Sequence, residues 1–139
     1  MSGFQGLYSV RDNKPGDNNF ILATFLRGLY YGETWFSEIP KDIFMDNYKK
    51  IAEALIHSPK VIIKVACLTD DPDTIIGYSI LSSDYQTVHF CYVKSAWRLK
   101  GVGKSLVPQH PTYVSHLTQL GKTLLSKLKP AVFNPFSLG

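Results

Sequence analysis

Residues 93–106 read V-K-S-A-W-R-L-K-G-V-G-K-S-L and directly follow an apolar, β-branched run over residues 87–93. We expect that run to be a strand, and the residues from 102 onward to begin a helix. Because Gly101 and Gly103 have no Cβ, the backbone between strand and helix can come close to a bound anion. The first amides of a helix lack intrahelical acceptors and carry partial positive charge. The stretch therefore predicts an anion site.

Basic side chains surround the same loop. Arg98, Lys100 and Lys104 add positive charge, which suits a diphosphate better than a lone carboxylate. The net charge of +4 agrees with an anionic ligand but does not identify one. Nucleic-acid binding through these residues and Lys94 is a less favoured alternative, because the chain contains no run of five basic residues.

Two other interpretations of the glycine stretch compete with a diphosphate site. Gly103-Lys104-Ser105 ends like a P-loop, but the first glycine of that motif would fall at Arg98. Residues 104–139 are also too few for the parallel sheet of a P-loop fold. The second alternative is that the glycines only make a tight turn between strand and helix.

The rest of the chain alternates between strand and helix patterns. This order predicts one domain over residues 1–139, of mixed α/β (α+β) type rather than purely parallel. In chain order we expect a strand over 7–11, a helix from 17 or 18 to 32, a helix from about 40 to 58, strands over 61–68, 74–81 and 87–93, a short helix over 102–107 that stops before Pro108, a strand over 113–117, a helix over 119–129 and a terminal edge strand over 131–136.

Residues 93–106 resemble motif A of the GNAT (Gcn5-related N-acetyltransferase) superfamily, in which Arg/Gln-x-x-Gly-x-Gly/Ala follows the fourth strand. The element order and the pair Gly77-Tyr78 extend the resemblance over residues 7–136. It implies a mixed, largely antiparallel central sheet flanked by helices, with acetyl-CoA as cosubstrate and no metal. The short length and the ending Asn134-Pro135-Phe136 resemble GNAT-like proteins that phages encode.

The resemblance also implies a set of cofactor-binding residues. Tyr92 and Val93 would pair their backbone with the pantetheine arm of the coenzyme. The residues expected around the pyrophosphate are Arg98, Leu99, Lys100, Gly101, Gly103, Lys104 and Ser105.

Acyl transfer to an amine needs a proton acceptor, because an amine with a pKa of about 10.4 is protonated at neutral pH. His89, four residues before Val93, and Glu33, in an aromatic loop after the first helix, are the candidate bases. Tyr113 and His116 are the candidate proton donors to the departing thiolate. Each has a structural alternative: a strand histidine, a solvated loop charge, a strand aromatic and a surface histidine. Cys91 lies in an apolar strand, where burial disfavours a thiolate nucleophile.

The expected function is an N-acyltransferase that moves an acetyl group from acetyl-CoA to an amine, on either a small molecule or a protein. The alternative is a catalytically inactive GNAT-fold binding or structural module, because Pro108 shortens the motif helix and no tyrosine begins the last helix. The sequence has neither a secretion signal nor eighteen consecutive apolar residues, which predicts a cytoplasmic protein that does not enter a membrane. A homodimer remains open.

Overall fold

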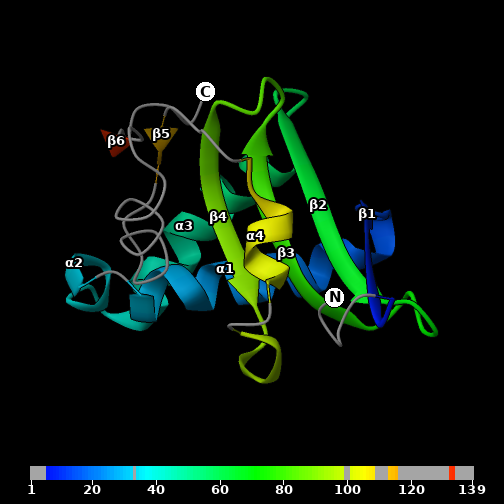
Figure 1. Cartoon of the computed structure of the whole chain (residues 1–139). Helices are drawn as coiled ribbons and strands as arrows, with labels where there is room; N and C mark the ends of the chain where they lie inside the picture. Colours follow the sequence, from blue (N-terminus) through cyan, green and yellow to red (C-terminus); the bar gives the residue numbers. More distant parts are fainter. Residues whose placement is uncertain (1–5, 33, 99–100, 109–112, 116–131, 134–139) are drawn as a thin grey trace.

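A computed structural model of the protein describes residues 6–32, 34–98, 101–108, 113–115 and 132–133 (Figure 1). The strands are β1 (Tyr8–Asp12), β2 (Val61–Leu68), β3 (Ile75–Ser82), β4 (Thr87–Val93), β5 (Tyr113–Val114) and β6 (Val132–Phe133). The α-helices are α1 (Asn18–Gly32), α2 (Thr34–Ser37), α3 (Lys41–Ile56) and α4 (Val102–Leu106), with single 3-10 turns at η1 (Pro15–Asp17) and η2 (Ser95–Trp97).

The strands form one mixed sheet in the order β1-β2-β3-β4-β5-β6. Neighbouring strands from β1 to β4 are antiparallel, whereas β4 pairs with β5, and β5 with β6, in parallel. The expected mixed, largely antiparallel sheet is therefore confirmed. A P-loop fold is excluded, because its phosphate loop requires a parallel sheet around it.

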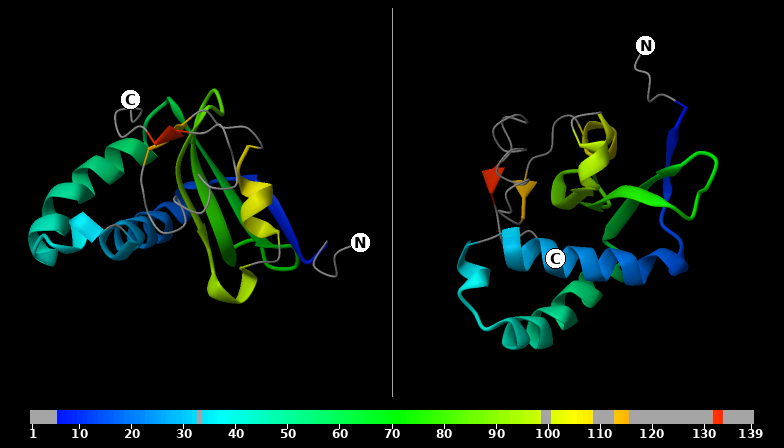
Figure 2. Two further views of the ribbon diagram at one scale, coloured as in Figure 1. Left: turned by 60° about the vertical axis from the view of Figure 1, so that its left-hand side comes forward. Right: turned by 90° about the horizontal axis from the view of Figure 1, so that it is seen from below.

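Helices cover both faces of the sheet (Figure 2). On one face, α1 lies against the strands and α3 lies beside α1, whereas α4 lies on the opposite face. Ile21, Phe25 and Leu29 recur at four-residue spacing along α1 and are fully buried. They belong to a cluster with strand residues such as Tyr78 and Phe90, and burial of each such apolar side chain contributes about 1.5 to 3 kcal/mol. This packing fixes α1 beneath β3 and β4.

The connection from β1 to α1 is held by an ion pair. The Arg11 guanidinium donates to both carboxylate oxygens of Asp17, at 2.8 and 3.1 Å. The same carboxylate accepts the Lys14 backbone amide at 2.7 Å. The hydrogen bond from Arg11 is the main reason that the pKa of Asp17 lies below its ordinary value. The edge strand and the first helix are thus joined in a fixed orientation.

Two glycines allow close contact between neighbouring elements. A Cβ on Gly28 of α1 would lie 2.6 Å from Cζ of Phe90 on β4, so the absent side chain lets helix and strand touch. A Cβ on Gly77 of β3 would lie 2.7 Å from the carbonyl oxygen of Tyr92 on β4. Both contacts position β4, the strand that leads into the glycine loop.

Replacing Gly77 with alanine is expected to destabilise the protein by about 1 to 3 kcal/mol. The new methyl group would meet a backbone carbonyl rather than a flexible side chain, so β3 and β4 must separate locally. Urea denaturation followed by circular dichroism measures the loss. Gly16→Ala is the matched control, because a Cβ there has no neighbour within 4 Å. Equal stability of the two variants would contradict the close contact.

The positions of most elements agree with the sequence pattern. Strands β2 and β4 have the expected bounds, and α1 begins and ends at expected residues. Helix α4 stops at Leu106, before Pro108. Of the expected strand over 113–117, the structure describes residues 113–115, of which Tyr113–Val114 form β5. Strand β6 falls within the expected edge strand over 131–136 and is the last strand in the sheet order. The expected helix over 119–129 lies outside the described residues. Helix α2 is not predicted by the sequence pattern.

Candidate functional site: the loop after strand β4

The glycine loop begins where β4 leaves the sheet. The Lys94 amide donates to the Ile76 carbonyl at 2.8 Å, and the 3-10 turn η2 follows. The Arg98 Nε donates to the Val93 carbonyl at 2.9 Å, so the arginine side chain folds back over the end of β4. The Trp97 ring contacts Tyr8 of β1 edge-on, with 6.1 Å between ring centroids, and closes the base of the loop.

Gly101 is the residue before α4, and its φ of +84° lies in the left-handed region. Side chains disfavour this conformation, so the local structure itself requires glycine here. No side chain caps the helix at Gly101. Because the Ser105 amide donates to the Gly101 carbonyl at 3.1 Å, helix geometry leaves the three amides before it without an intrahelical acceptor.

Gly103 has a different character. A Cβ at this position would meet only Cγ2 of Val93, at an ordinary contact distance of 3.6 Å. Packing within the described residues therefore does not require glycine at 103. An approaching ligand would explain why the position has no side chain.

Helix α4 has only five residues, so its dipole is weaker than that of a longer helix. The Ser79 hydroxyl on β3 donates to the Leu106 carbonyl at 2.7 Å and fixes the C-terminal end. The Ser105 hydroxyl donates to the Val102 carbonyl at 2.7 Å and lies 3.3 Å from the Tyr8 hydroxyl. The Ser105 hydroxyl hydrogen is thus already donated within the protein, so Ser105 is a weaker candidate for contacting a phosphate than the sequence suggests.

Two described cationic side chains belong to the loop and its helix: Arg98 and Lys104. Within the described residues, no carboxylate forms an ion pair with either of them. Lys94 is a third cation at the end of β4, but its ammonium lies over the Phe20 ring of α1, 5.6 Å from the ring centroid, on the other face of the sheet from α4. The structure does not describe Leu99 and Lys100, so their expected contacts stay predictions.

Strands β4 and β5 are paired only at their first residues. The register joins Thr87 to Tyr113 and Val88 to Val114, and in the described part of the chain no later residue of β4 pairs with β5. A register shift between β3 and β4 leaves His89 as an extra residue, which is a β-bulge. Tyr92 and Val93 follow on the section of β4 beyond this pairing. The Tyr92 ring faces α1, 6.0 Å from the Phe20 ring, and Val93 packs on the α4 side.

His89 is almost fully buried, with 2% of its surface exposed, and its Nδ1 lies 2.8 Å from the Ser115 hydroxyl. Burial lowers the pKa of His89 to about 4, so the imidazole is neutral at pH 7. A group with this pKa is a weak acceptor for the proton of an alkylammonium. Ser115 directly follows β5. Its contact with His89 could not be predicted from the sequence, because the two residues are 26 positions apart and belong to no common motif.

Of the other candidate catalytic residues, the structure describes only Tyr113. It begins β5, its surface is 37% exposed, and its backbone amide donates to the Gln86 carbonyl at 2.9 Å. Glu33 and His116 lie outside the described residues. Burial raises the pKa of the Cys91 thiol to about 12, which agrees with the expectation that it is not a nucleophile.

Among the described residues, no three His, Cys, Asp or Glu side chains come together as a metal site would require. No helix within them has the length and apolar character needed to cross a lipid bilayer.

No protein-family model matches the sequence, and no curated protein matches it. Solved structures do match it over most of its length. A "possible acetyltransferase" from Clostridium difficile 630 is 18% identical, with a TM-score of 0.50, over 91% of this chain and 76% of that chain. A proposed acetyl transferase from Pyrococcus furiosus is 14% identical, with a TM-score of 0.58, over 91% of this chain and 81% of that chain.

A third match is the structure described as "histone acetyltransferase HPA2 and related acetyltransferase" from Corynebacterium glutamicum. It is 14% identical, with a TM-score of 0.51, over 86% of this chain and 71% of that chain. At these identities the likeness concerns the fold. The chain is an α+β protein whose antiparallel strands lead through β4 into a glycine loop and a short helix. It has the GNAT fold.

Proposed function

We propose that the protein is an N-acetyltransferase that takes its acetyl group from acetyl-CoA and transfers it to an amine. One observation carries the proposal. At the end of β4 in a GNAT fold, left-handed Gly101 lies between Arg98 and Lys104 in the chain, and no described carboxylate pairs with these two cations. Such a loop suits a diphosphate, because backbone amides and both cations can contact its oxygens together.

The short helix α4 changes how the pyrophosphate would be bound. A five-residue helix contributes little dipole, so the side chains of Arg98 and Lys104 would supply most of the attraction. Arg98 would contribute the best-positioned charge, since its hydrogen bond to the Val93 carbonyl holds the guanidinium at the end of β4. From there a pantetheine arm would run back along Tyr92 and Val93, where β4 has no described partner in β5.

The proposed reaction is direct transfer. The amine nitrogen attacks the thioester carbonyl carbon, the new C–N bond forms, and the C–S bond breaks to release coenzyme A as a thiolate. The alkylammonium gives one proton to the base before the attack, and the nitrogen loses a second proton as the amide forms. One proton is taken up by the thiolate and the other passes to solvent. This route needs no covalent enzyme intermediate, in keeping with the raised pKa of Cys91. Since His89 is neutral and weakly basic, Glu33 becomes the preferred proton acceptor, with Tyr113 or His116 as the donor to the thiolate.

Isothermal titration with acetyl-CoA, followed by detection of released thiol with a panel of amines, tests the proposal. We expect saturable binding, with thiol released above the rate of spontaneous hydrolysis for at least one amine class. Desulfo-CoA is a control for binding, because it keeps the diphosphate and lacks the thioester. If neither acetyl-CoA nor desulfo-CoA bound, the proposed function would be refuted.

A second candidate function is a GNAT-fold module that binds without catalysis. Two features favour it: α4 has only five residues, and the histidine on β4 is buried and neutral at pH 7. Binding of acetyl-CoA without thiol release from any amine would support this alternative.

A further inference from the structure

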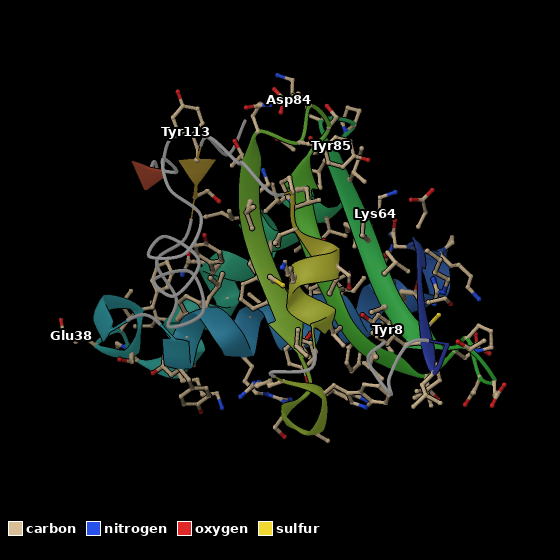
Figure 3. All side chains as sticks on the ribbon, in the orientation of Figure 1. Tyr8, Glu38, Lys64, Asp84, Tyr85 and Tyr113 are labelled. Carbon is tan, nitrogen blue, oxygen red and sulfur yellow. The ribbon has the colours of Figure 1, made fainter. Side chains whose placement is uncertain are left out.

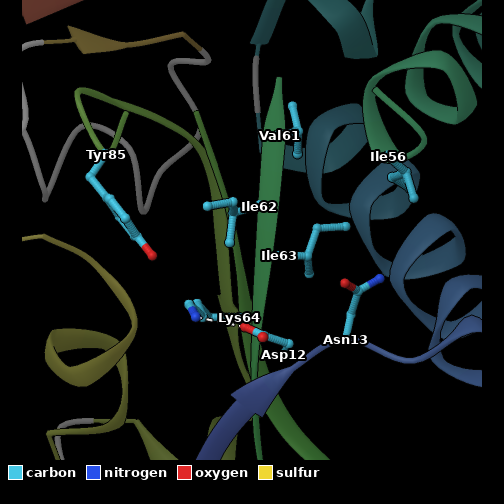
Figure 4. A pocket seen from close by; sticks show the side chains of 8 residues that line it. All are labelled: Asp12, Asn13, Ile56, Val61, Ile62, Ile63, Lys64 and Tyr85. Atoms are coloured by element: carbon cyan, nitrogen blue, oxygen red, sulfur yellow. Dashed lines mark hydrogen bonds and ion pairs between the residues drawn. The ribbon is translucent and has the colours of Figure 1, made fainter. Parts of the chain in front are cut away.

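A cavity of about 450 Å³ opens at the edge of the sheet where β1 ends and β2 continues (Figure 4). After Asp12 the chain turns away, and the Asn13 amide makes a last hydrogen bond to the Ile63 carbonyl at 3.2 Å. The first residues of β2 therefore project beyond their neighbour. The volume is in the range of cavities that bind small molecules. The hairpin between β3 and β4 that overhangs it lies at the opposite end of the sheet from the glycine loop (Figure 3).

Lys64, Asp12 and Tyr85 bring their polar groups together at this cavity, whereas Asn13 lies on the other side of β2. The Lys64 ammonium donates to the Asp12 carboxylate at 2.6 Å, and the Tyr85 hydroxyl points toward Lys64 (Figure 4). The hydrogen bond to Asp12 is the main cause that raises the pKa of Lys64, and Tyr85 acts in the same direction. The ammonium has three N–H donors and the phenol has one O–H donor. Two donors can therefore reach a common ligand.

Tyr85 is held over the cavity at a conformational cost. Its φ of 61° lies in the left-handed region, which bulky residues disfavour. The surrounding turn enforces this geometry through the Asp84 carboxylate. It accepts the Ser82 hydroxyl at 2.6 Å and the Gln86 amide at 3.0 Å. The turn therefore holds the Tyr85 side chain in a defined position at the cavity.

Apolar side chains complete the cavity. Ile62 lies between Tyr85 and Lys64 on the same side of β2, whereas Val61 and Ile63 line the cavity from the other side of the strand. A ligand that fits has a small group able to accept two hydrogen bonds and an aliphatic body beside it. An ammonium ligand is disfavoured, since it would lie next to Lys64.

We propose that this cavity binds a small aliphatic carboxylate, whose oxygens accept hydrogen bonds from Lys64 and Tyr85 while its alkyl chain lies on Ile62. Asp12 is a competitor for Lys64 rather than a part of the binding surface. Its side chain is 78% exposed, so it can turn into water when a ligand carboxylate arrives. The proposal does not depend on acetyl-CoA binding, because the glycine loop contributes nothing to this cavity.

Titration of the whole chain with hexanoate, followed by two-dimensional amide NMR, tests the site. We expect saturable shifts at residues 61–64 and 85 at millimolar hexanoate, and none with hexylammonium. Tyr85→Phe keeps the ring and should weaken binding about three- to tenfold, the range for one hydrogen bond. Lys64→Met should abolish binding. Asp12→Asn should strengthen it by a similar factor, because it removes the competing carboxylate.

Lys49→Met on α3 is the matched control, since Lys49 is exposed and does not line the cavity, and this variant should bind hexanoate as the unaltered protein does. The dispersion of the same spectra reports whether each variant is folded. Absence of saturable hexanoate shifts would overturn the proposal. So would stronger binding of hexylammonium that Asp12→Asn abolishes, because the site would then select a cation.

Discussion

Gly103→Glu is expected to abolish the stabilisation of the protein by acetyl-CoA while the ligand-free protein stays folded. The glycine has room for a Cβ, whose nearest neighbour would be Val93 Cγ2 at 3.6 Å. A glutamate side chain would then occupy the space in front of the loop and bring a negative charge to the position proposed for the diphosphate. Repulsion between like charges and steric exclusion act in the same direction.

The expected magnitude follows from mass action. Acetyl-CoA at one hundred times its dissociation constant stabilises the folded state by about 2.7 kcal/mol, which corresponds to roughly 10 °C in the melting temperature of a domain of this size. Differential scanning fluorimetry measures this shift. It should be full for the unaltered protein and near zero for Gly103→Glu.

Two control variants separate the causes. Gly103→Gln has the same size without the charge, so it should keep a small part of the shift if charge contributes. Gly103→Ala adds only a methyl group, for which the ligand-free structure has space, so it should stay folded and lose less of the shift than Gly103→Gln. An undiminished shift in Gly103→Glu would show that the coenzyme binds elsewhere, or that 103 does not face it.

Local patterns in the sequence predict much of this fold. The β-branched runs over 61–68 and 87–93 coincide with β2 and β4, because such residues favour strands wherever they pair. The terminator Pro108 predicts the early end of α4. Helix α2 is missed, since four residues are too few for a periodic pattern.

Contacts between distant residues could not be predicted in the same way. The bulge at His89 depends on how β4 pairs with β3, and the sequence of β4 alone does not specify that register. The same holds for the close approach of Gly28 to Phe90, which depends on where α1 crosses the sheet.

The candidate site likewise combines features that are local in sequence with contacts between distant residues. The left-handed conformation at Gly101 agrees with a pattern of glycines and cations that is local in sequence. The engagement of the Ser105 hydroxyl with Tyr8 joins residues 97 positions apart, so no motif reveals it. The cavity under Tyr85 combines β1, β2 and a hairpin turn, and none of these segments carries a recognisable motif.

Acidification from pH 6.5 to pH 4 is expected to destabilise the protein by up to about 3 kcal/mol through His89 alone, whose pKa falls from 6.5 to about 4 on folding. Between these values the unfolded state binds a proton at this residue and the folded state does not. Stability from His89 is therefore complete above pH 6.5, declines as the pH falls, and changes no further below about 4. Asp17 and Asp84 act below this window, because folding lowers their pKa from 3.8.

Urea denaturation at pH 7, 6, 5 and 4 measures the effect. His89→Gln keeps an amide that can still contact the Ser115 hydroxyl but does not titrate, so its stability should vary much less over this range. His57→Gln is the matched control, because His57 is exposed at the end of α3, and its pH dependence should follow that of the unaltered protein. If His89→Gln kept the full slope, the imidazole would not be the group that folding holds neutral. A general-base role for His89 at pH 7 would then regain support, since its basicity would be ordinary.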